Sequence, residues 1–217
     1  MSEQETLSAL TVFWQKTGKK LSVVIGAILV IVLGYIAYGS YIQSPKELKA
    51  SEELFTAENY FRKDSFNLAL NGSGSVPGFL KVISKYNGTK SANLAKLYAG
   101  ICLLRTGQYQ KAIEQLEDFD SKGSNQVEAK AEGLLGDAYS ELKKNDQAID
   151  HYKSAGNLFP EDQAISSEYL FRAALLSEVV GKNDQAVELF KTVKDKYPRT
   201  EKGFVVDKYL ARLGVLN

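Results

Sequence analysis

Two residue types that often carry chemistry occur only once in this chain, as Cys102 and His151. A metal ion needs several ligands and a catalytic nucleophile needs a neighbouring base, so single residues of these types make neither kind of site. His151 has no cysteine or histidine partner, and no basic residue adjoins Cys102 to lower its pKa. We therefore expect a surface histidine, a buried unreactive thiol, no metal, no cofactor and no enzymatic activity.

Charged residues are spread evenly along the chain. The sequence has 27 basic and 26 acidic residues, and its basic residues form no cluster. This balance argues against nucleic-acid binding, which needs an excess of clustered positive charge. The acidic run from Glu114 to Asp120 is typical of a solvated helix face. The sequons at Asn71 and Asn87 are explained equally well as turns, because glycine follows each asparagine.

Three segments share one spacing of small and large residues, which indicates an internal repeat. In each, a small residue is followed 12 residues later by an alanine, and a large apolar residue stands 4 residues after that alanine. These intervals are similar to those of the tetratricopeptide repeat, a unit of two antiparallel helices. The three series are Gly100–Ala112–Leu116, Gly136–Ala148–Tyr152 and Ala174–Ala186–Phe190.

Helix packing explains why these residue types recur over residues 91–199. Two helices lie close together where small side chains meet, so we expect the small residues of the repeats to face the alanines. Pro160 and Pro198 end the second helix of a pair, because proline cannot donate the next backbone hydrogen bond. Each pair leaves an apolar face that only the next pair covers. Residues 200–217 then supply a helix that caps the last repeat.

Residues 43–90 look like a degenerate first helix pair with an insertion. The spacing of apolar residues predicts one helix over 46–63, continuing the preceding helix after a break at Pro45, and a short helix over 78–86. Between these helices the chain is rich in Asn, Gly and Ser. The alternation in this part predicts a short strand or an extended loop, with one face formed by Phe66, Leu68 and Leu70.

The longest uncharged segment is the 22-residue run from Leu21 to Ile42. At about 1.5 Å per residue, a helix of this length extends about 33 Å, enough to cross the ~30 Å hydrocarbon core of a bilayer. A cleaved signal peptide is the alternative, but its apolar part is shorter and ends in small residues, whereas this run closes with tyrosines. We therefore predict a transmembrane helix over 21–42, preceded by a cytoplasmic tail at 1–20.

The flanks of this helix favour one orientation by a small margin. Three lysines precede it and two follow it, so the positive-inside rule places the N-terminus in the cytoplasm and the large C-terminal part outside. The lysines are Lys16, Lys19 and Lys20, then Lys46 and Lys49. Aromatic residues on both flanks fit the belts at membrane interfaces, namely Phe13 and Trp14, then Tyr35, Tyr38 and Tyr41.

A stack of helix pairs offers a concave groove, built mainly from the first helix of each pair. An apolar groove with acidic edges suits a hydrophobic or amphipathic segment of a partner protein, and Asp137 would repel a C-terminal carboxylate. Alternatively, the helices predicted over 46–90, rather than a partner protein, cover the apolar part of this groove. The partner-binding residues predicted from the repeat register are Leu94, Leu97, Ile101, Leu104, Lys130, Asp137, Phe171 and Leu175.

Together these features predict an all-α protein, with a single N-terminal transmembrane helix followed by a tetratricopeptide-repeat α-solenoid. The arrangement, and the phrases YNGTKSANLAKLYAGICLL and GQYQKAIEQLEDF, resemble the YfgM-like ancillary subunits of the bacterial Sec translocon in their Bacteroidetes form. The resemblance implies a single-pass inner-membrane protein with a periplasmic domain. It also implies two partners, the SecYEG translocon and the membrane-anchored chaperone and prolyl isomerase PpiD. Such a protein supports translocation and the hand-over of emerging chains to periplasmic chaperones.

Two other functions fit the same elements. The chain could be a scaffold of another cell-envelope assembly or secretion complex, although it has no N-terminal lipobox cysteine. It could also be an organelle import receptor with its repeats in the cytosol. The opposite topology distinguishes this receptor, so the accessibility of Cys102 or of a C-terminal tag to a membrane-impermeant reagent would separate the two.

Overall fold

The computed structural model describes residues 3–215, with side chains from Lys20 onward and those of Trp14 and Thr17 before it. The side chains of Phe13, Lys16 and Lys19, which the sequence places at the start of the span, lie outside the described residues. The chain forms two compact units, Met1–Lys49 and Ala50–Asn217.

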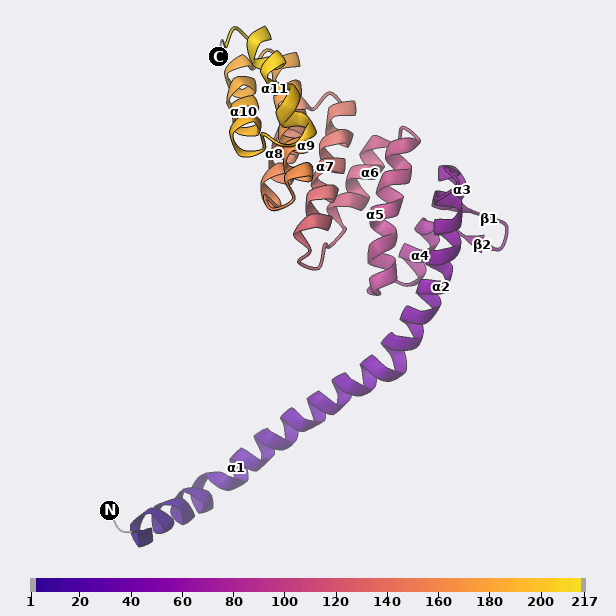
Figure 1. The fold of residues 1–217 in the computed structure, drawn as a ribbon. Helices are drawn as coiled ribbons and strands as arrows, with labels where there is room; N and C mark the ends of the chain where they lie inside the picture. The colour runs from indigo at the N-terminus through magenta and orange to yellow at the C-terminus, as the bar shows by residue number, and fades with distance from the viewer. Residues whose placement is uncertain (1–2, 216–217) are drawn as a thin grey trace. The chain divides into compact units, whose positions relative to one another are not determined.

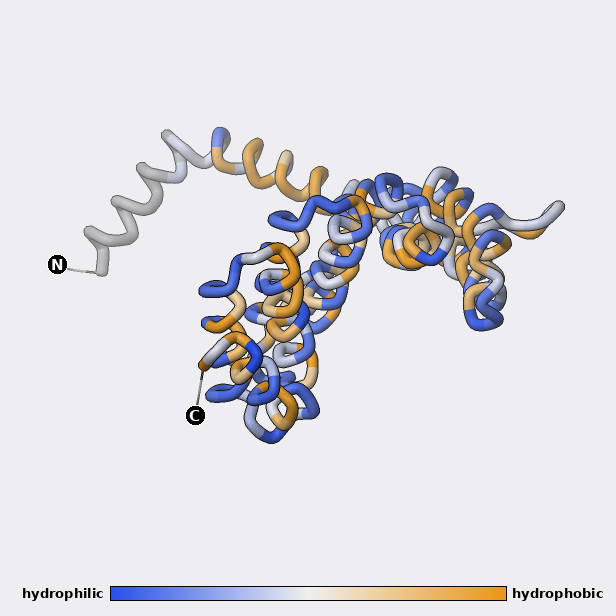
Figure 2. Tube along the Cα trace, turned by 90° about the horizontal axis from the view of Figure 1, so that it is seen from above, coloured by the Kyte–Doolittle hydropathy of each residue, from blue (hydrophilic) through white to orange (hydrophobic). Residues whose placement is uncertain are grey.

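The first unit is helical from end to end of its described part. It comprises α1 (Glu3–Tyr38), a π-helical turn (Gly39–Gln43) and the start of α2 (Ser44–Phe61). The residues of α1 after Lys20 are mostly apolar (Figure 2). By length and composition, one helix in the described residues is long and apolar enough to cross a membrane, and its most apolar window is not buried against the protein.

The predicted break at Pro45 is absent, because a π-helical turn precedes the proline. The Ser44 N–H donates to the Gly39 carbonyl, five residues back, and the Ser44 hydroxyl donates to the same oxygen at 2.9 Å. A π-helical turn changes the hydrogen-bonding register by one residue. The helix can therefore accept a residue that has no N–H and continue past it.

The segment after α2 is helical where a strand or an extended loop was predicted, so that prediction is wrong for α3 (Phe66–Asn71). Leu70 and its neighbour Ala69 are both buried, while Leu68 is 41 % exposed. Two adjacent buried residues suit a helix, since a strand would turn them to opposite faces. The predicted short helix is present as α4 (Phe79–Lys85).

A small hairpin connects α3 to α4. Its strands, β1 (Gly72–Ser73) and β2 (Val76–Pro77), are antiparallel and pair Ser73 with Val76. Gly72 has a φ of 82°, and a Cβ at this position would lie 2.2 Å from the Val76 carbonyl oxygen. Only glycine fits such a backbone.

Helix pairs stack side by side along the rest of the second unit (Figure 1). A short turn joins the two helices of each pair, and α11 packs against the last pair. The molecule is thus an all-α tetratricopeptide-type solenoid, as predicted. Its helices are α5 (Lys90–Arg105), α6 (Tyr109–Glu117), α7 (Asn125–Glu141), α8 (Asn145–Leu158), α9 (Gln163–Val179), α10 (Asn183–Lys196) and α11 (Glu201–Arg212).

The turn inside each pair has the same backbone conformation. Its central residue has a positive φ: 75° at Gly107, 60° at Lys143 and 79° at Gly181. The N–H of the following residue donates back to a carbonyl of the first helix, as in the Gln108 bond to Leu103 at 2.8 Å. This is the left-handed cap that commonly ends a helix.

The repeat glycines Gly100 and Gly136 make room for large side chains rather than for alanines. A Cβ on Gly100 would lie 2.6 Å from Leu116, and a Cβ on Gly136 would lie 2.6 Å from the Tyr152 ring. In both pairs the large residue is the one that stands four residues after the repeat alanine. Leu116 and Tyr152 need this space because their side chains extend between the two helices of the pair. Ala112 and Ala148 are small enough to be buried without it.

Candidate interaction surface

The first helices of the pairs, α5, α7 and α9, together with α11, form one side of the solenoid, which we call the first-helix face. Two ion pairs connect neighbouring helices there. Arg172 on α9 reaches Asp137 on α7 at 3.0 Å, and Lys202 on α11 reaches Glu168 on α9 at 3.1 Å. Residues more than 30 positions apart in the sequence are thereby brought into contact.

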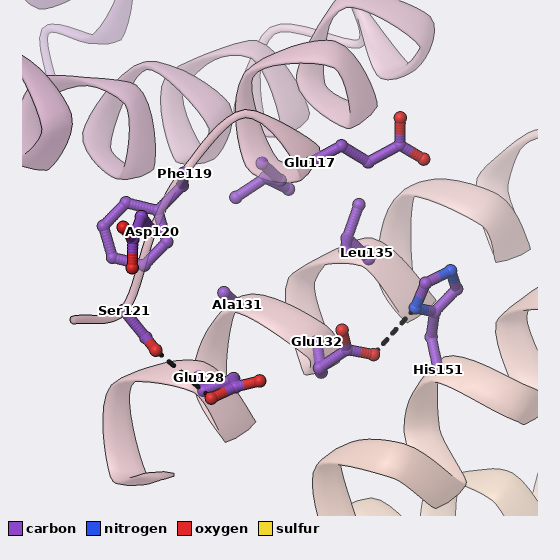
Figure 3. A pocket seen from close by; sticks show the side chains of 10 residues that line it. Glu117, Phe119, Asp120, Ser121, Glu128, Ala131, Glu132, Leu135 and His151 are labelled. Atoms are coloured by element: carbon purple, nitrogen blue, oxygen red, sulfur yellow. Dashed lines mark hydrogen bonds and ion pairs between the residues drawn. The ribbon is translucent and has the colours of Figure 1, made fainter. Parts of the chain in front are cut away.

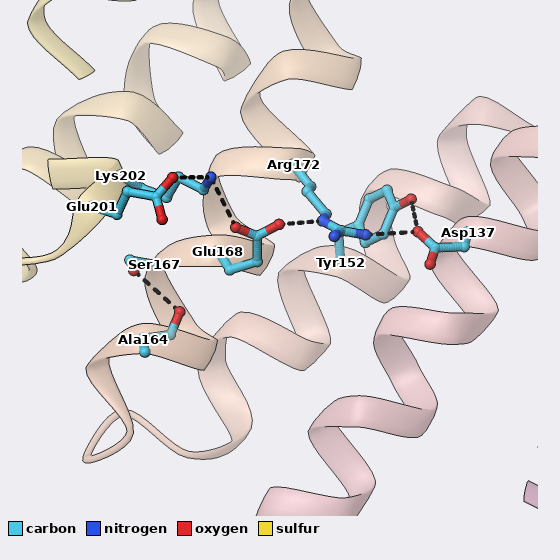
Figure 4. Close-up of polar contacts among 8 residues, drawn as sticks. All are labelled: Asp137, Tyr152, Ala164, Ser167, Glu168, Arg172, Glu201 and Lys202. Atoms are coloured by element: carbon cyan, nitrogen blue, oxygen red, sulfur yellow. Dashed lines mark hydrogen bonds and ion pairs between the residues drawn. The ribbon is translucent and has the colours of Figure 1, made fainter. Parts of the chain in front are cut away.

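These ion pairs form a continuous chain of charges, which we call the charge ladder: Asp137, Arg172, Glu168 and Lys202 (Figure 4). Arg172 is in the middle, since its Nε also donates to Glu168 at 2.6 Å. Asp137 accepts a further hydrogen bond of 2.6 Å from the Tyr152 hydroxyl. Asp137, the acidic residue that the sequence placed in the groove, is therefore already paired within the protein.

The surroundings change the acidity of the ladder residues. Burial alone would raise the pKa of Glu168, but the hydrogen bonds from Arg172 and Lys202 outweigh it and lower the pKa below its ordinary value. Burial, and then the bond to Asp137, raises the pKa of the Tyr152 hydroxyl. Each shift favours the state that makes the bonds, a charged Glu168 and a neutral Tyr152.

A glycine on α7 positions an aromatic ring beside the ladder. A Cβ on Gly133 would lie 2.1 Å from the Tyr169 ring, so the ring can take this position because residue 133 is glycine. The Tyr169 ring lies 6.4 Å from that of Tyr152, and the Arg172 guanidinium is 5.7 Å from its centroid. The ring of Tyr169, a residue of α9, thus lies in the space between α9 and α7.

A cavity of about 600 Å³ opens next to this ring on the first-helix face. It lies among α7, α9 and the start of α11, and its wall includes the apolar side chain of Ile165 and the ring of Tyr169. Two further basic residues line it, Lys130 and Arg199. Both are exposed, and neither makes an ion pair or a hydrogen bond with the part of the chain that the structure describes.

The predicted groove residues of α5 are partly accessible. Leu94 is 37 % exposed, and Leu97, Ile101 and Leu104 are half-buried. The preceding helices pack on a stripe of α5 that includes Ala92, Ala95, Ala99 and Cys102, and Leu104 also packs against this cluster.

The four predicted residues of the later repeats differ in their surroundings. Lys130 is exposed, and Asp137 is occupied by the ladder. Leu175 is half-buried against the core. Phe171 is only 4 % exposed, so the prediction that it faces the groove is wrong: its ring packs 5.4 Å from that of Phe190 and 4.9 Å from that of Tyr209.

A second cavity, of about 420 Å³, lies among α6, α7 and α8 (Figure 3). His151 lines it and pairs with Glu132, with 2.8 Å between Nδ1 and Oε2. Its ring also stacks on Tyr139 at 5.0 Å. Sequence reasoning missed this partner, because Glu132 comes from the preceding helix, 19 residues earlier. The described residues contain no group of three or more metal-ligating side chains.

Cys102 is buried, as expected. Burial raises the pKa of its thiol to about 12. A thiol with this pKa carries almost no thiolate at neutral pH and is a poor nucleophile. Thr89, from one of the two sequons, is buried and caps α5 by accepting the Ala92 N–H at 3.0 Å.

Comparison with known proteins supports the repeat assignment. The tetratricopeptide repeat family model matches residues 134–162 and 168–200. A crystal structure of MamA protein is 19 % identical, with a TM-score of 0.53 and 76 % of each chain covered. A MamA RS-1 ArsTM double mutant is 17 % identical, with a TM-score of 0.56, covering 92 % of this chain and 94 % of that one.

These comparisons support the fold of the second unit and identify two of its repeats. At such identities, the likeness to the two solved structures shows the fold alone. No curated protein matches the chain. Two helix pairs of the second unit match the tetratricopeptide repeat, and the extended surface of a stack of such repeats is of the kind that binds other proteins.

Proposed function

We propose that this protein is a membrane-anchored adaptor that binds partner proteins at a protein-translocation site. The observation that carries the proposal is the presence, in one chain, of an uncharged helix long enough to cross a membrane and a repeat scaffold with an accessible first-helix face. The span contains no charged residue, so it offers no transport path of its own. Its role is to keep the scaffold near the membrane.

The specific site that we propose is the SecYEG translocon of a bacterial inner membrane. Support comes from the resemblance to YfgM-like subunits, which is one of architecture over the span and the repeats and one of sequence in the phrases at residues 86–104 and 107–119. In this proposal the tail at 1–20 is cytoplasmic and the repeats are periplasmic. They bind a membrane-anchored chaperone of the PpiD type and help hand over emerging chains. The proposal gives the chain no catalytic role.

Co-purification tests the partner. The full-length protein, tagged at its C-terminus, would be isolated from membranes in a mild detergent, with and without prior crosslinking. We expect SecY and a periplasmic chaperone among the recovered proteins. A matched control is the same chain with its span replaced by an unrelated span of equal length, which separates binding through the repeats from binding through the helix. If neither protein is recovered from either sample, the translocon assignment is wrong.

Topology tests the compartment. Cys102 is unsuitable as a reporter because it is buried. We therefore suggest Cys102→Ala combined with Lys191→Cys, since Lys191 is exposed on α10. In intact spheroplasts a membrane-impermeant maleimide should label this cysteine, while a cysteine at Ser2 should be labelled only after lysis. The reverse result would indicate repeats in the cytosol, as in an import receptor.

A further inference from the structure

The cavity on the first-helix face has an uneven distribution of free and paired charges. Its two carboxylates, Glu168 and Glu201, both form ion pairs with Lys202. Its two other cations, Lys130 and Arg199, have no ionic or hydrogen-bonding partner in the described part of the chain. The acidic groups are thus occupied, and the charge that remains available to a ligand is positive.

The same cavity has an apolar wall that the protein keeps in place. The Tyr169 ring takes its present position because residue 133 is glycine, and the Arg172 guanidinium lies over the ring. Ile165, one turn earlier on α9, is half-buried beside it. Because neighbouring side chains already hold the Tyr169 ring, a ligand that packs on it costs little additional side-chain entropy in the protein.

We infer that this cavity binds a short acidic segment of a partner protein that also carries an aromatic or large aliphatic side chain. The carboxylates of the segment pair with Lys130 and Arg199, and its apolar side chain packs on Tyr169 and Ile165. Charge complementarity selects this occupant over a basic or purely apolar segment. The inference rests on the proposed function only in requiring a protein partner, and it names the chemistry of that partner.

Peptide binding to the full-length protein in detergent micelles tests the inference. The probe is a fluorescein-labelled peptide of about ten residues with alternating Asp and Phe, measured by fluorescence anisotropy. Two comparison peptides replace every Asp with Asn or with Lys. We expect binding of the acidic peptide, at least about fivefold weaker binding of the Asn peptide, and weakening as salt is raised from about 50 to 500 mM.

A charge-reversed variant identifies the site. Lys130→Glu with Arg199→Glu should weaken binding of the acidic peptide by about tenfold or more, because two attractions become repulsions. The matched control is Lys111→Glu with Lys191→Glu, two exposed residues on second helices, which changes the net charge equally. The control should bind like the original protein. Circular dichroism would confirm that both variants keep their helices.

Three results would overturn the inference: no binding of the acidic peptide, equal binding of the Asn peptide, or equal weakening by the two double variants. These results are independent of the translocon experiment. If SecY co-purifies but the acidic peptide does not bind, the partner chemistry is wrong and the proposed function stands. If the peptide binds with the expected selectivity but SecY is not recovered, the site stands and its partner lies elsewhere.

Discussion

Ion pairs of this protein join residues at nearly the repeat period. Arg172 and Asp137 are 35 positions apart, Lys182 and Asp146 are 36 apart, and Arg212 and Glu178 are 34 apart. Equivalent positions of successive repeats lie next to each other in a solenoid, so opposite charges at these positions meet. Each exposed pair contributes little by itself, but Glu168 bonds to two cations and is the best candidate for a measurable effect.

Replacing Glu168 with Gln should lower stability in a pH-dependent way. The pKa of Glu168 is lower in the folded protein than in the unfolded chain, so its contribution is present above the ordinary Glu pKa of about 4.3 and is lost as pH falls through the folded value. We expect the variant to be about 1 kcal/mol less stable in urea unfolding at pH 7, with the difference shrinking towards pH 3. Glu188→Gln, on the exposed side of α10, is the control. A difference independent of pH would contradict this account.

The thiol of Cys102 should be unreactive until the solenoid unfolds. Burial raises its pKa to about 12 and also blocks reagents. Iodoacetamide at pH 8 should therefore modify the native protein far more slowly than the urea-unfolded protein, by at least about a hundredfold, as mass spectrometry would show. Comparable rates in the two states would mean that the core around α5 opens readily.

At the level of helices, the turns inside the pairs are equivalent but not identical in sequence. Gly107 and Gly181 occupy the left-handed position in two pairs, and Lys143 occupies it in the middle pair, with a φ of 60°. A residue with a Cβ adopts this conformation at a cost, whereas glycine does not. The turn of the middle pair is thus the one that a substitution by glycine can make more stable.

Lys143→Gly should stabilise the protein. Relief of the left-handed strain outweighs the extra flexibility of the unfolded chain, and we expect a gain of about 0.5–1 kcal/mol in urea unfolding. The neighbouring Lys144 has a φ of −86°, so Lys144→Gly is the matched control and should be neutral or destabilising. If both substitutions act alike, the turn conformation is not the cause.

Gly136→Ala should destabilise the protein, whereas the same substitution usually stabilises a helix. Alanine normally stabilises a helix interior relative to glycine by about 0.5–1 kcal/mol. Here the added Cβ would lie 2.6 Å from the Tyr152 ring, so we expect a loss of about 1–3 kcal/mol from overpacking. Thermal unfolding by circular dichroism would measure it, with the exposed Gln147→Ala as control. A stabilised variant would show that the ring moves aside without cost.

For the whole molecule, the proposed function depends on joining an apolar helix to a repeat scaffold in one chain. The span is uncharged over 22 residues, and the second unit has its own cores. Tethering raises the effective concentration of the scaffold near other membrane proteins without adding any contact. Loss of the membrane helix should therefore impair partner binding even when the repeats are intact.

Two charges placed in the middle of the span should release the protein from the membrane. Val30→Lys with Ile31→Lys costs about 2.5–3.5 kcal/mol for each lysine at the centre of a bilayer. Resistance to carbonate extraction should fall sharply compared with Val30→Leu and Ile31→Leu together. A variant that still resists extraction would show that the N-terminal helix does not hold the protein in the membrane.

The sequence by itself determined the fold class, the helix pairs and the membrane-spanning candidate. Each depends on patterns within a short stretch of chain: an uncharged run of fixed length, or small and large residues at fixed intervals. The prediction was wrong at residues 66–70. The alternating pattern there indicated a strand or loop, but the segment is a helix and its buried residues are adjacent. Local periodicity is ambiguous over so few residues, and packing against α4 and α5 decided the outcome.

Only the tertiary structure decided which side chains of the first-helix face are available. Phe171 lies in the core and Asp137 is paired, while Lys130 and Arg199 remain free among the residues that the structure describes. The sequence shows the type and helical position of each residue. Pairing and burial depend on distances between side chains from helices more than 30 residues apart, and these distances exist only once the repeats have stacked.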